Sequence, residues 1–201
     1  PALPKKLRVP ANFVQDDEGV WQLQQGKRTW QQWRKRAALD ADLPAPVEFH
    51  APLQLNSEQQ SVLDALLSTT QSTNEPPAPQ LLFGITGSGK TEVYLHYLAQ
   101  ILQHDECAQV LILVPEINLT PQFAQRLTER FGEQAVVSLH SGLNDGERLL
   151  AWWRAAYGHA RVILGTRLSI LAMIPNLRAI VVDEEHDPSY RQQDGIRYSA
   201  R

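Results

Sequence analysis

Short apolar runs alternate with stretches of helical spacing along the chain beyond residue 80. Runs with the length and content of buried strands occur at 81–83, 110–114, 136–139, 162–164 and 180–182. Between them, apolar residues recur at helical spacing over 93–102 and 123–131, and a third helix should begin near Asn144 or Asp145. Short strands joined by helical crossovers predict an α/β fold with a doubly wound, mostly parallel sheet.

A different pattern precedes residue 80, where one helix lies between polar connecting segments. The helix is predicted to begin with Asn56 or Ser57 as its N-cap. It should end near Ser68, because 68–80 is polar and proline-rich, as is typical of a mobile loop. The stretch 40–52 is also proline-rich, and its weak periodicity predicts a connector laid over a surface.

Charge marks a boundary at the same connector. Lysine and arginine cluster within 5–36 and do not occur in 37–89. We therefore divide the chain into 1–52, a linker or the end of a preceding domain, and 53–201, one globular lobe. Because the chain starts at Pro1 and stops at Arg201 without a closing element, we expect it to be a piece of a longer protein.

The basic stretch 27–36 places Trp30 and Trp33 among cations. Such a pair can stack on bases or dock a partner helix. We favour an amphipathic helix whose tryptophans pack on a neighbouring domain, since this is the commoner use of the pattern.

Composition excludes few functions. The chain has 201 residues, 43% of them apolar, and a formal net charge of −3, which does not exclude a protein that grips one nucleic-acid strand with local cations. A single cysteine, Cys107, cannot build a disulfide framework or a zinc site and suits a reducing cytosol. No apolar run approaches the ~20 residues that span a bilayer. We expect a cytoplasmic protein without membrane partners.

The strongest chemical signal is GITGSGKT at 84–91, which fits the P-loop spacing after a predicted strand and before a predicted helix. Its glycines let backbone N–H groups surround a phosphate at a helix N-terminus. Lys90 should reach the β and γ phosphates of ATP, and Thr91 should help to coordinate Mg²⁺. The residues predicted to hold the nucleotide here are Gly84, Ile85, Thr86, Gly87, Ser88, Gly89, Lys90 and Thr91.

The second half of the site is predicted at DEEH, which follows the strand 180–182. Asp183 is placed at the carboxyl end of that strand, where it can hold Mg²⁺ through water. Glu184 can orient and deprotonate the attacking water. An acidic, solvated strand end would be the favoured alternative without the P-loop.

Other P-loop classes lack their signatures here, since the sequence shows no [NT]-K-x-D guanine reader and no LSGGQ segment. A helicase or translocase remains. In LNSEQ, Gln59 lies one helix ahead of the P-loop, and its amide can pair a donor and an acceptor with adenine.

Further blocks narrow this class to a family: LVPEINLTPQ (113–122), LHSGLNDGERL (139–149), GTRLSI (165–170) and the segment 183–201. Together with LNSEQ and the P-loop they resemble the PriA family of superfamily 2 replication-restart DNA helicases, over 53–201. The resemblance implies the first RecA-like lobe, preceded by the end of a winged-helix domain and its linker.

It also implies an ATP-driven 3′–5′ helicase that unwinds forks and initiates primosome assembly, bacterial, cytoplasmic and nucleoid-associated. Expected partners are single-stranded and forked DNA, the single-stranded-DNA-binding protein and primosome loaders. The family's second lobe, arginine finger and zinc-binding cysteines are not in this chain, so zinc is expected only in the parent protein and the isolated chain should bind ATP better than it hydrolyses it.

By the same resemblance, His186 couples the ATP and DNA sites, and two edges of the lobe meet DNA phosphates. We predict that the segment 187–201 transmits DNA binding to the ATP site, with aromatic rings that stack on bases and cations that bind phosphates. The predicted DNA-binding residues are Pro115, Thr120, Pro121, Gln122, Gly165, Thr166, Arg167, Tyr190, Arg191, Arg197 and Tyr198. Alternatives remain for several: Thr120 and Pro121 also suit an ordinary helix start, and the tyrosines suit a loop that covers the lobe's own core.

Two other functions stay open. One is a docking module that binds a nucleotide, never hydrolyses it and signals its presence to partners. The other is a different DEAH-type superfamily 2 translocase. Glu184 favours a motor over the docking module, since a sensor has no use for a general base.

Overall fold

The structure is a computed structural model that describes residues 13–15, 21–23, 44–50, 53–70, 78–116, 120–191 and 198–200. Its strands are β1 (Phe13–Gln15), β2 (Trp21–Leu23), β3 (Gln109–Leu113), β4 (Val136–Leu139), β5 (Val162–Gly165) and β6 (Leu177–Val182). Its helices are α2 (Ser57–Thr70), α3 (Lys90–His104), α4 (Pro121–Phe131) and α5 (Asp145–Ala156), with short 3-10 helices η2 (Arg167–Leu171) and η3 (Pro188–Tyr190).

A four-stranded parallel sheet organises the lobe, in the order β4-β5-β3-β6. β3 lies inside the sheet and is buried along its whole length. β1 and β2 form a separate antiparallel pair. The predicted parallel sheet is therefore confirmed, with four of the predicted strands in place and their ends shifted by up to three residues.

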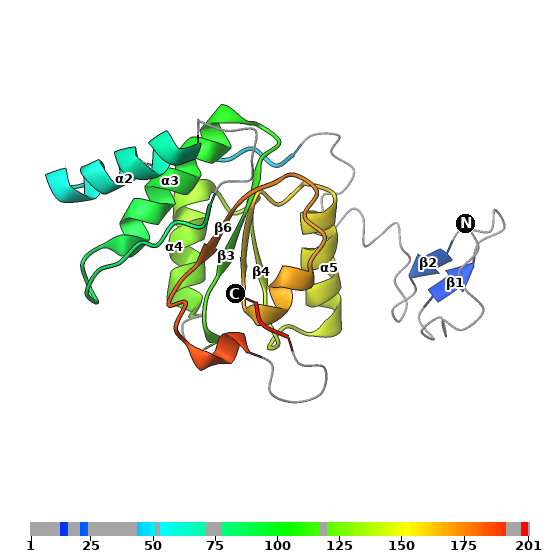
Figure 1. Cartoon of the computed structure of the whole chain (residues 1–201). Helices are drawn as coiled ribbons and strands as arrows, with labels where there is room; N and C mark the ends of the chain where they lie inside the picture. The colour runs from blue at the N-terminus through cyan, green and yellow to red at the C-terminus, as the bar shows by residue number, and fades with distance from the viewer. Residues whose placement is uncertain are drawn as a thin grey trace.

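Helices cover both faces of this sheet, with α3 and α4 on one side and α5 on the other (Figure 1). Apolar side chains of α3 and α4 pack on alternate residues of the strands, including Val110, Ile112 and Leu164. The intervening residues face α5, and Leu111 and Ile163 pack there with Ala155. This alternation is what a parallel sheet buried on both faces requires, and it confirms the doubly wound architecture.

Caps fix the starts of the helices where the sequence predicts them. Asn56 accepts a hydrogen bond from the Gln59 N–H at 2.8 Å and its own N–H is bound by the Gln59 amide oxygen at 3.0 Å. Thr120 caps α4, with Pro121 in the first turn. Asn144 forms a complete capping box at the start of α5.

The strand predicted at 81–83 is not formed, which is the main error of the sequence analysis. Leu81 and Phe83 are 82% and 91% exposed, and among the described residues this segment pairs with no strand of the sheet. A strand is stable only when a neighbouring strand binds its N–H and C=O groups, and apolar content alone does not provide that neighbour. The P-loop therefore follows a largely exposed segment without regular secondary structure.

The predicted connector lies over the lobe, as expected, in its described part. The N–H groups of Ala45, Glu48 and His50 donate to the carbonyls of His159, Phe131 and Arg130 at 3.1–3.3 Å. The tryptophan-containing stretch 27–36 and most of the predicted loop, 71–77, lie outside the described residues. No helix in the described parts of the chain has the length and apolarity needed to cross a membrane.

Candidate nucleotide site

The P-loop is shaped by glycines with left-handed backbone angles. Gly87 and Gly89 have φ values of 82° and 83°, which side chains with a Cβ rarely adopt. The Ser88 N–H donates to the Ile85 carbonyl at 3.2 Å, and Gly89 forms the N-cap of α3. The residues 84–88 are partly or fully exposed. The chain thus presents a turn of backbone N–H groups at a helix N-terminus, the arrangement that binds phosphates.

Lys90 points back into this turn. Its Nζ donates to the Gly84 carbonyl at 2.7 Å and to the Ile85 carbonyl at 2.9 Å. The ammonium group therefore lies within the loop, where an anion bound by the loop would meet it. Thr91 follows on the first turn of α3 and is half-buried.

Gln59 supports the P-loop from α2. Its Nε2 donates to the Ser88 carbonyl at 3.1 Å, while its amide oxygen binds the Asn56 N–H. Gly89 is favoured by its positive φ, and a Cβ there would lie 2.3 Å from the same Nε2 and displace the end of the Gln59 side chain. The Gln59 amide, which was predicted to contact adenine, thus uses its oxygen and one N–H to bind the protein itself. The sequence did not indicate this supporting role.

Asp183 stands at the carboxyl end of β6, beside α3. Its N–H donates to the Leu113 carbonyl at 2.9 Å, which continues the pairing of β6 with β3. Its Oδ1 accepts the Glu184 N–H at 3.0 Å, and its Oδ2 accepts the Tyr94 hydroxyl at 3.0 Å. Tyr94 lies one turn beyond Lys90 on α3, so the structure brings the two predicted halves of the site together.

Thr91 lies three residues before Tyr94 on the same face of α3. The hydroxyl of Thr91 and the carboxylate of Asp183 are the oxygen donors that the two halves of the site supply. Oxygen donors of these two kinds suit Mg²⁺, which commonly takes one or two protein ligands and completes its shell with water and phosphates. No cluster of three or more His, Cys, Asp or Glu side chains in the described residues could hold a metal alone. The donor set fits Mg²⁺ bound together with a nucleotide.

Glu184 has a left-handed backbone with φ 48°, which is rare for a residue other than glycine, asparagine or aspartate. The turn is closed by the Asp187 N–H, which donates to the Glu184 carbonyl at 2.9 Å. Glu184 and His186 are both exposed. The backbone after β6 thus turns sharply and presents both predicted catalytic side chains at the surface.

Tyr190 corrects the prediction for the segment that follows. It is fully buried, at 0% exposure. Its hydroxyl lies 2.6 Å from the Asp183 carbonyl oxygen and 3.0 Å from that of Leu113, and can donate its hydrogen to either. The prediction that its ring stacks on DNA bases is wrong, because the ring packs in the core beside α5. The residue instead fastens η3 to the ends of β3 and β6.

The other residues predicted to bind DNA differ in their exposure to solvent. Thr120, Pro121, Gln122 and Arg191 are exposed. Pro115, Gly165 and Thr166 are buried, which disfavours direct contact of these predicted DNA-binding residues with a phosphate. Gly165 has no room for a Cβ, which would lie 2.4 Å from the Ser169 Cβ.

Arg167 and Tyr198 are half-buried. Arg167 Nη1 donates to the Ser189 carbonyl at 3.2 Å and, at the limit of hydrogen bonding, to that of Arg191 at 3.5 Å. The hydroxyl of Tyr198 is buried. Arg197 lies outside the described residues. The GTR segment therefore contacts the backbone of η3 and its end, and of the predicted DNA contacts among the described residues four remain exposed.

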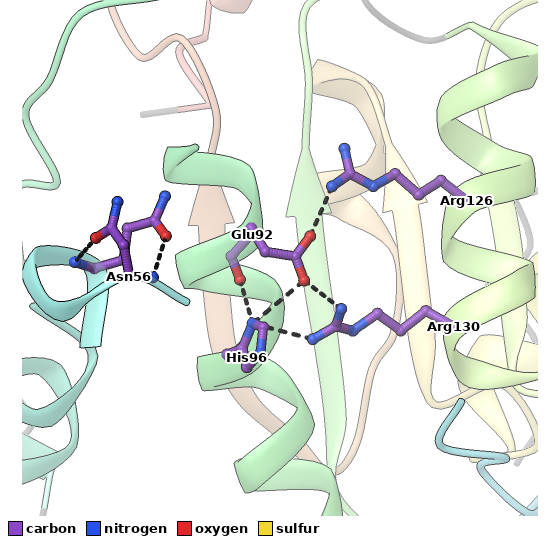
Figure 2. A network of polar contacts seen from close by, with 6 residues as sticks. Asn56, Glu92, His96, Arg126 and Arg130 are labelled. Carbon is purple, nitrogen blue, oxygen red and sulfur yellow. Dashed lines mark hydrogen bonds and ion pairs between the residues drawn. The ribbon is translucent and has the colours of Figure 1, made fainter. Parts of the chain in front are cut away.

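A buried ion cluster joins α3 to α4 (Figure 2). Glu92, on the first turn of α3, receives Arg126 Nη2 at 2.7 Å and is also paired with Arg130 Nη1. His96 Nδ1 lies 3.3 Å from the same carboxylate. The side chains of Glu92 and Arg130 are 9% and 10% exposed, whereas that of Arg126 is 44% exposed.

The sequence analysis overlooked Glu92 and did not single out Tyr94. Both occur in GKTEVYL, directly after the P-loop. A usable signal was present, since a glutamate within a helix face that also carries Val93 and Leu95 needs a buried cation as partner. Nothing in the spacing alone indicates that the tyrosine meets Asp183, 89 residues away.

Comparison with known proteins gives a consistent result. Residues 56–201 match the DEAD/DEAH box helicase family. The replication restart protein PriA of Haemophilus influenzae is 53% identical over 121 residues, which cover 60% of this chain and 16% of that protein. The PriA of Bacillus subtilis is 40% identical over 150 residues, 75% of this chain and 18% of that protein. The chain thus spans less than a fifth of the length of these relatives, and the predicted resemblance is confirmed.

Among solved structures, the DUF1998 helicase MrfA bound to DNA has a similar fold, with a TM-score of 0.51 and 14% identity over 82% of this chain and 25% of that one. At this identity the likeness supports the fold alone.

Proposed function

The chain belongs to the DEAD/DEAH box helicase family, and on that basis we propose that it is the ATP-binding lobe of an ATP-dependent 3′–5′ DNA helicase that unwinds forks and initiates primosome assembly in replication restart. The observation that carries the proposal is the convergence of the P-loop and Asp183 on one side of the sheet through α3. The names of the relatives support the replication-restart role.

In this proposal the P-loop N–H groups and Lys90 bind the phosphates of ATP, and Gln59 holds the loop in shape from α2. Thr91 and Asp183 hold Mg²⁺, which when bound neutralises charge on the phosphates. When a phosphate binds, the Lys90 ammonium must give up its hydrogen bonds to the Gly84 and Ile85 carbonyls or share them with the phosphate. This costs little free energy, because the carbonyls and the phosphate would lie at the same turn.

Glu184 takes the role of general base. Its exposure, and its position directly after the proposed metal ligand Asp183, support this role, since a carboxylate there could accept a proton from an attacking water. Asp183 is a poor choice for both roles, because a carboxylate that holds a metal cation is stabilised in its ionised form and accepts a proton less readily.

For DNA we propose the exposed residues Thr120, Pro121, Gln122 and Arg191 as contacts with phosphates, which carry no base specificity. Arg167 acts indirectly, through the carbonyls of Ser189 and Arg191. His186 couples the two sites. We infer cytoplasmic, nucleoid-associated action in a bacterium, with the single-stranded-DNA-binding protein and primosome loaders as further partners.

The test is a single-turnover ATPase assay of the full-length protein that carries this chain, with and without forked DNA. We expect forked DNA to stimulate hydrolysis and ATP to support strand separation. Saturable ATP binding without any stimulated hydrolysis would identify the nucleotide-gated docking module instead. Hydrolysis with translocation but no role at forks would identify a different DEAH-type translocase.

A further inference from the structure

Tyr94 occupies a position in the site that its apolar neighbours on α3 do not share. It is 5% exposed, yet its hydroxyl is directed at the carboxylate of Asp183, 3.0 Å away, rather than at the core. Thr91, the other residue to which the proposed function gives Mg²⁺, lies three residues earlier on the same face of α3.

We propose that Tyr94 is a positioning residue, whose phenol holds Asp183 in the orientation that receives the Mg²⁺ of a bound nucleotide. The inference rests on the proposed function, because this orientation matters only if the chain binds Mg·ATP.

A phenol carries one hydrogen, and Tyr94 donates it to Asp183 Oδ2. This bond uses one lone pair of Oδ2 and leaves other lone pairs of the carboxylate for a cation.

Asp183 is held from two sides. The Glu184 N–H binds Oδ1 at 3.0 Å, and Tyr94 binds Oδ2. Without the phenol only one oxygen stays fixed, and the carboxylate can rotate about the bond to its Cβ. Partners of this kind orient a metal ligand, and their removal typically lowers metal affinity by about 10–100-fold.

The competing view is that Tyr94 only fills the core. Tyr94→Phe distinguishes the two, since it keeps the ring and removes the hydroxyl. Tyr97→Phe is the matched control, because it makes the same chemical change one turn further along α3 on a partly buried ring. Tyr94→His, whose shorter side chain cannot span the same distance, is a second removal variant if Tyr94→Phe does not fold.

The measurement is binding of a fluorescent ADP analogue to the 201-residue chain, first in EDTA and then at increasing Mg²⁺. For Tyr94→Phe we expect unchanged affinity in EDTA and an about tenfold rise in the Mg²⁺ concentration for half-maximal effect. Tyr97→Phe should follow the wild type. In an Asp183→Asn background, Tyr94→Phe should add much less, because the positioned carboxylate is gone.

Wild-type Mg²⁺ dependence in a folded Tyr94→Phe or Tyr94→His chain overturns the inference, and so does an equal loss of affinity with and without Mg²⁺, which indicates packing alone. Failure of the wild-type chain to bind the analogue at all is a different result. It overturns the proposed nucleotide site and the inference with it.

Discussion

Replacement of Glu92 by glutamine should destabilise the lobe far more than an average surface change. The carboxylate is 9% exposed in its side chain and is paired with Arg130, which is 10% exposed. Removing one partner of a buried ion pair costs about 3–5 kcal/mol, because the remaining charge is left without compensation. Glutamine keeps an oxygen that can accept a hydrogen bond, so we expect a loss near the lower end, about 3 kcal/mol.

Burial also ranks the two arginines. Arg126 is 44% exposed, so solvent screens its ion pair, and its replacement by glutamine should cost about 1 kcal/mol or less. Arg130→Gln should cost about as much as Glu92→Gln. The matched control is Glu129→Gln on α4, an exposed carboxylate that accepts from Gln125 at 2.7 Å, with an expected change within about 0.5 kcal/mol.

Urea unfolding of the 201-residue chain measures these values. With a slope of about 1–3 kcal/mol per molar urea, Glu92→Gln should lower the midpoint by roughly 1 M or more without changing the slope. A double-mutant cycle with Arg130→Gln should show a loss smaller than the sum of the two single losses. A shift as small as that of Glu129→Gln, or a larger loss for Arg126 than for Arg130, would refute the reasoning from burial.

Three further changes test other parts of the site. In the full-length protein, Glu184→Gln should retain Mg·ATP affinity and lose turnover by several orders of magnitude in a single-turnover assay, and near-normal turnover would assign the base elsewhere. Gly89→Ala should weaken nucleotide binding and lower stability by about 1 kcal/mol or more, because the position needs a positive φ and contacts Gln59; calorimetry and urea unfolding check both. Tyr190→Phe should lower the free energy of unfolding in urea by about 1–3 kcal/mol, since it removes the hydroxyl that binds two carbonyls. Replacement of the exposed Arg191 by alanine should leave stability nearly unchanged and reduce the stimulation of ATP hydrolysis by DNA. The reverse pattern would support the role first predicted for Tyr190 from the sequence.

Local patterns predicted most of the fold. Helix starts carry their own chemistry in the capping residues, so Asn56, Thr120 and Asn144 were predictable from sequence alone. Strands buried on both faces read as continuous apolar runs, and four of the five predicted runs pair in the sheet. The run at 81–83 has the same composition and fails, because pairing depends on a neighbouring strand that composition does not report.

The site was predictable only in part, for a related reason. The P-loop and DEEH depend on short local motifs, and the structure brings both to α3. The roles of Tyr94 and Tyr190 depend on where a hydroxyl points after the sheet is assembled, and Tyr190 bonds to Leu113, 77 residues away. The composition of the segment, tyrosines beside arginines, favoured stacking of Tyr190 on nucleic acid. In the structure its ring is buried and packs in the core instead.

The central claim, that this lobe binds ATP through the P-loop and DEEH, is tested most directly by calorimetric titration of the 201-residue chain with a non-hydrolysable Mg·ATP analogue. The account predicts one saturable site, weakened when Mg²⁺ is removed and abolished by Lys90→Ala, in a variant that unfolds at the same urea concentration as the wild type. Absence of binding in the folded wild-type chain, or wild-type affinity in Lys90→Ala, would contradict it.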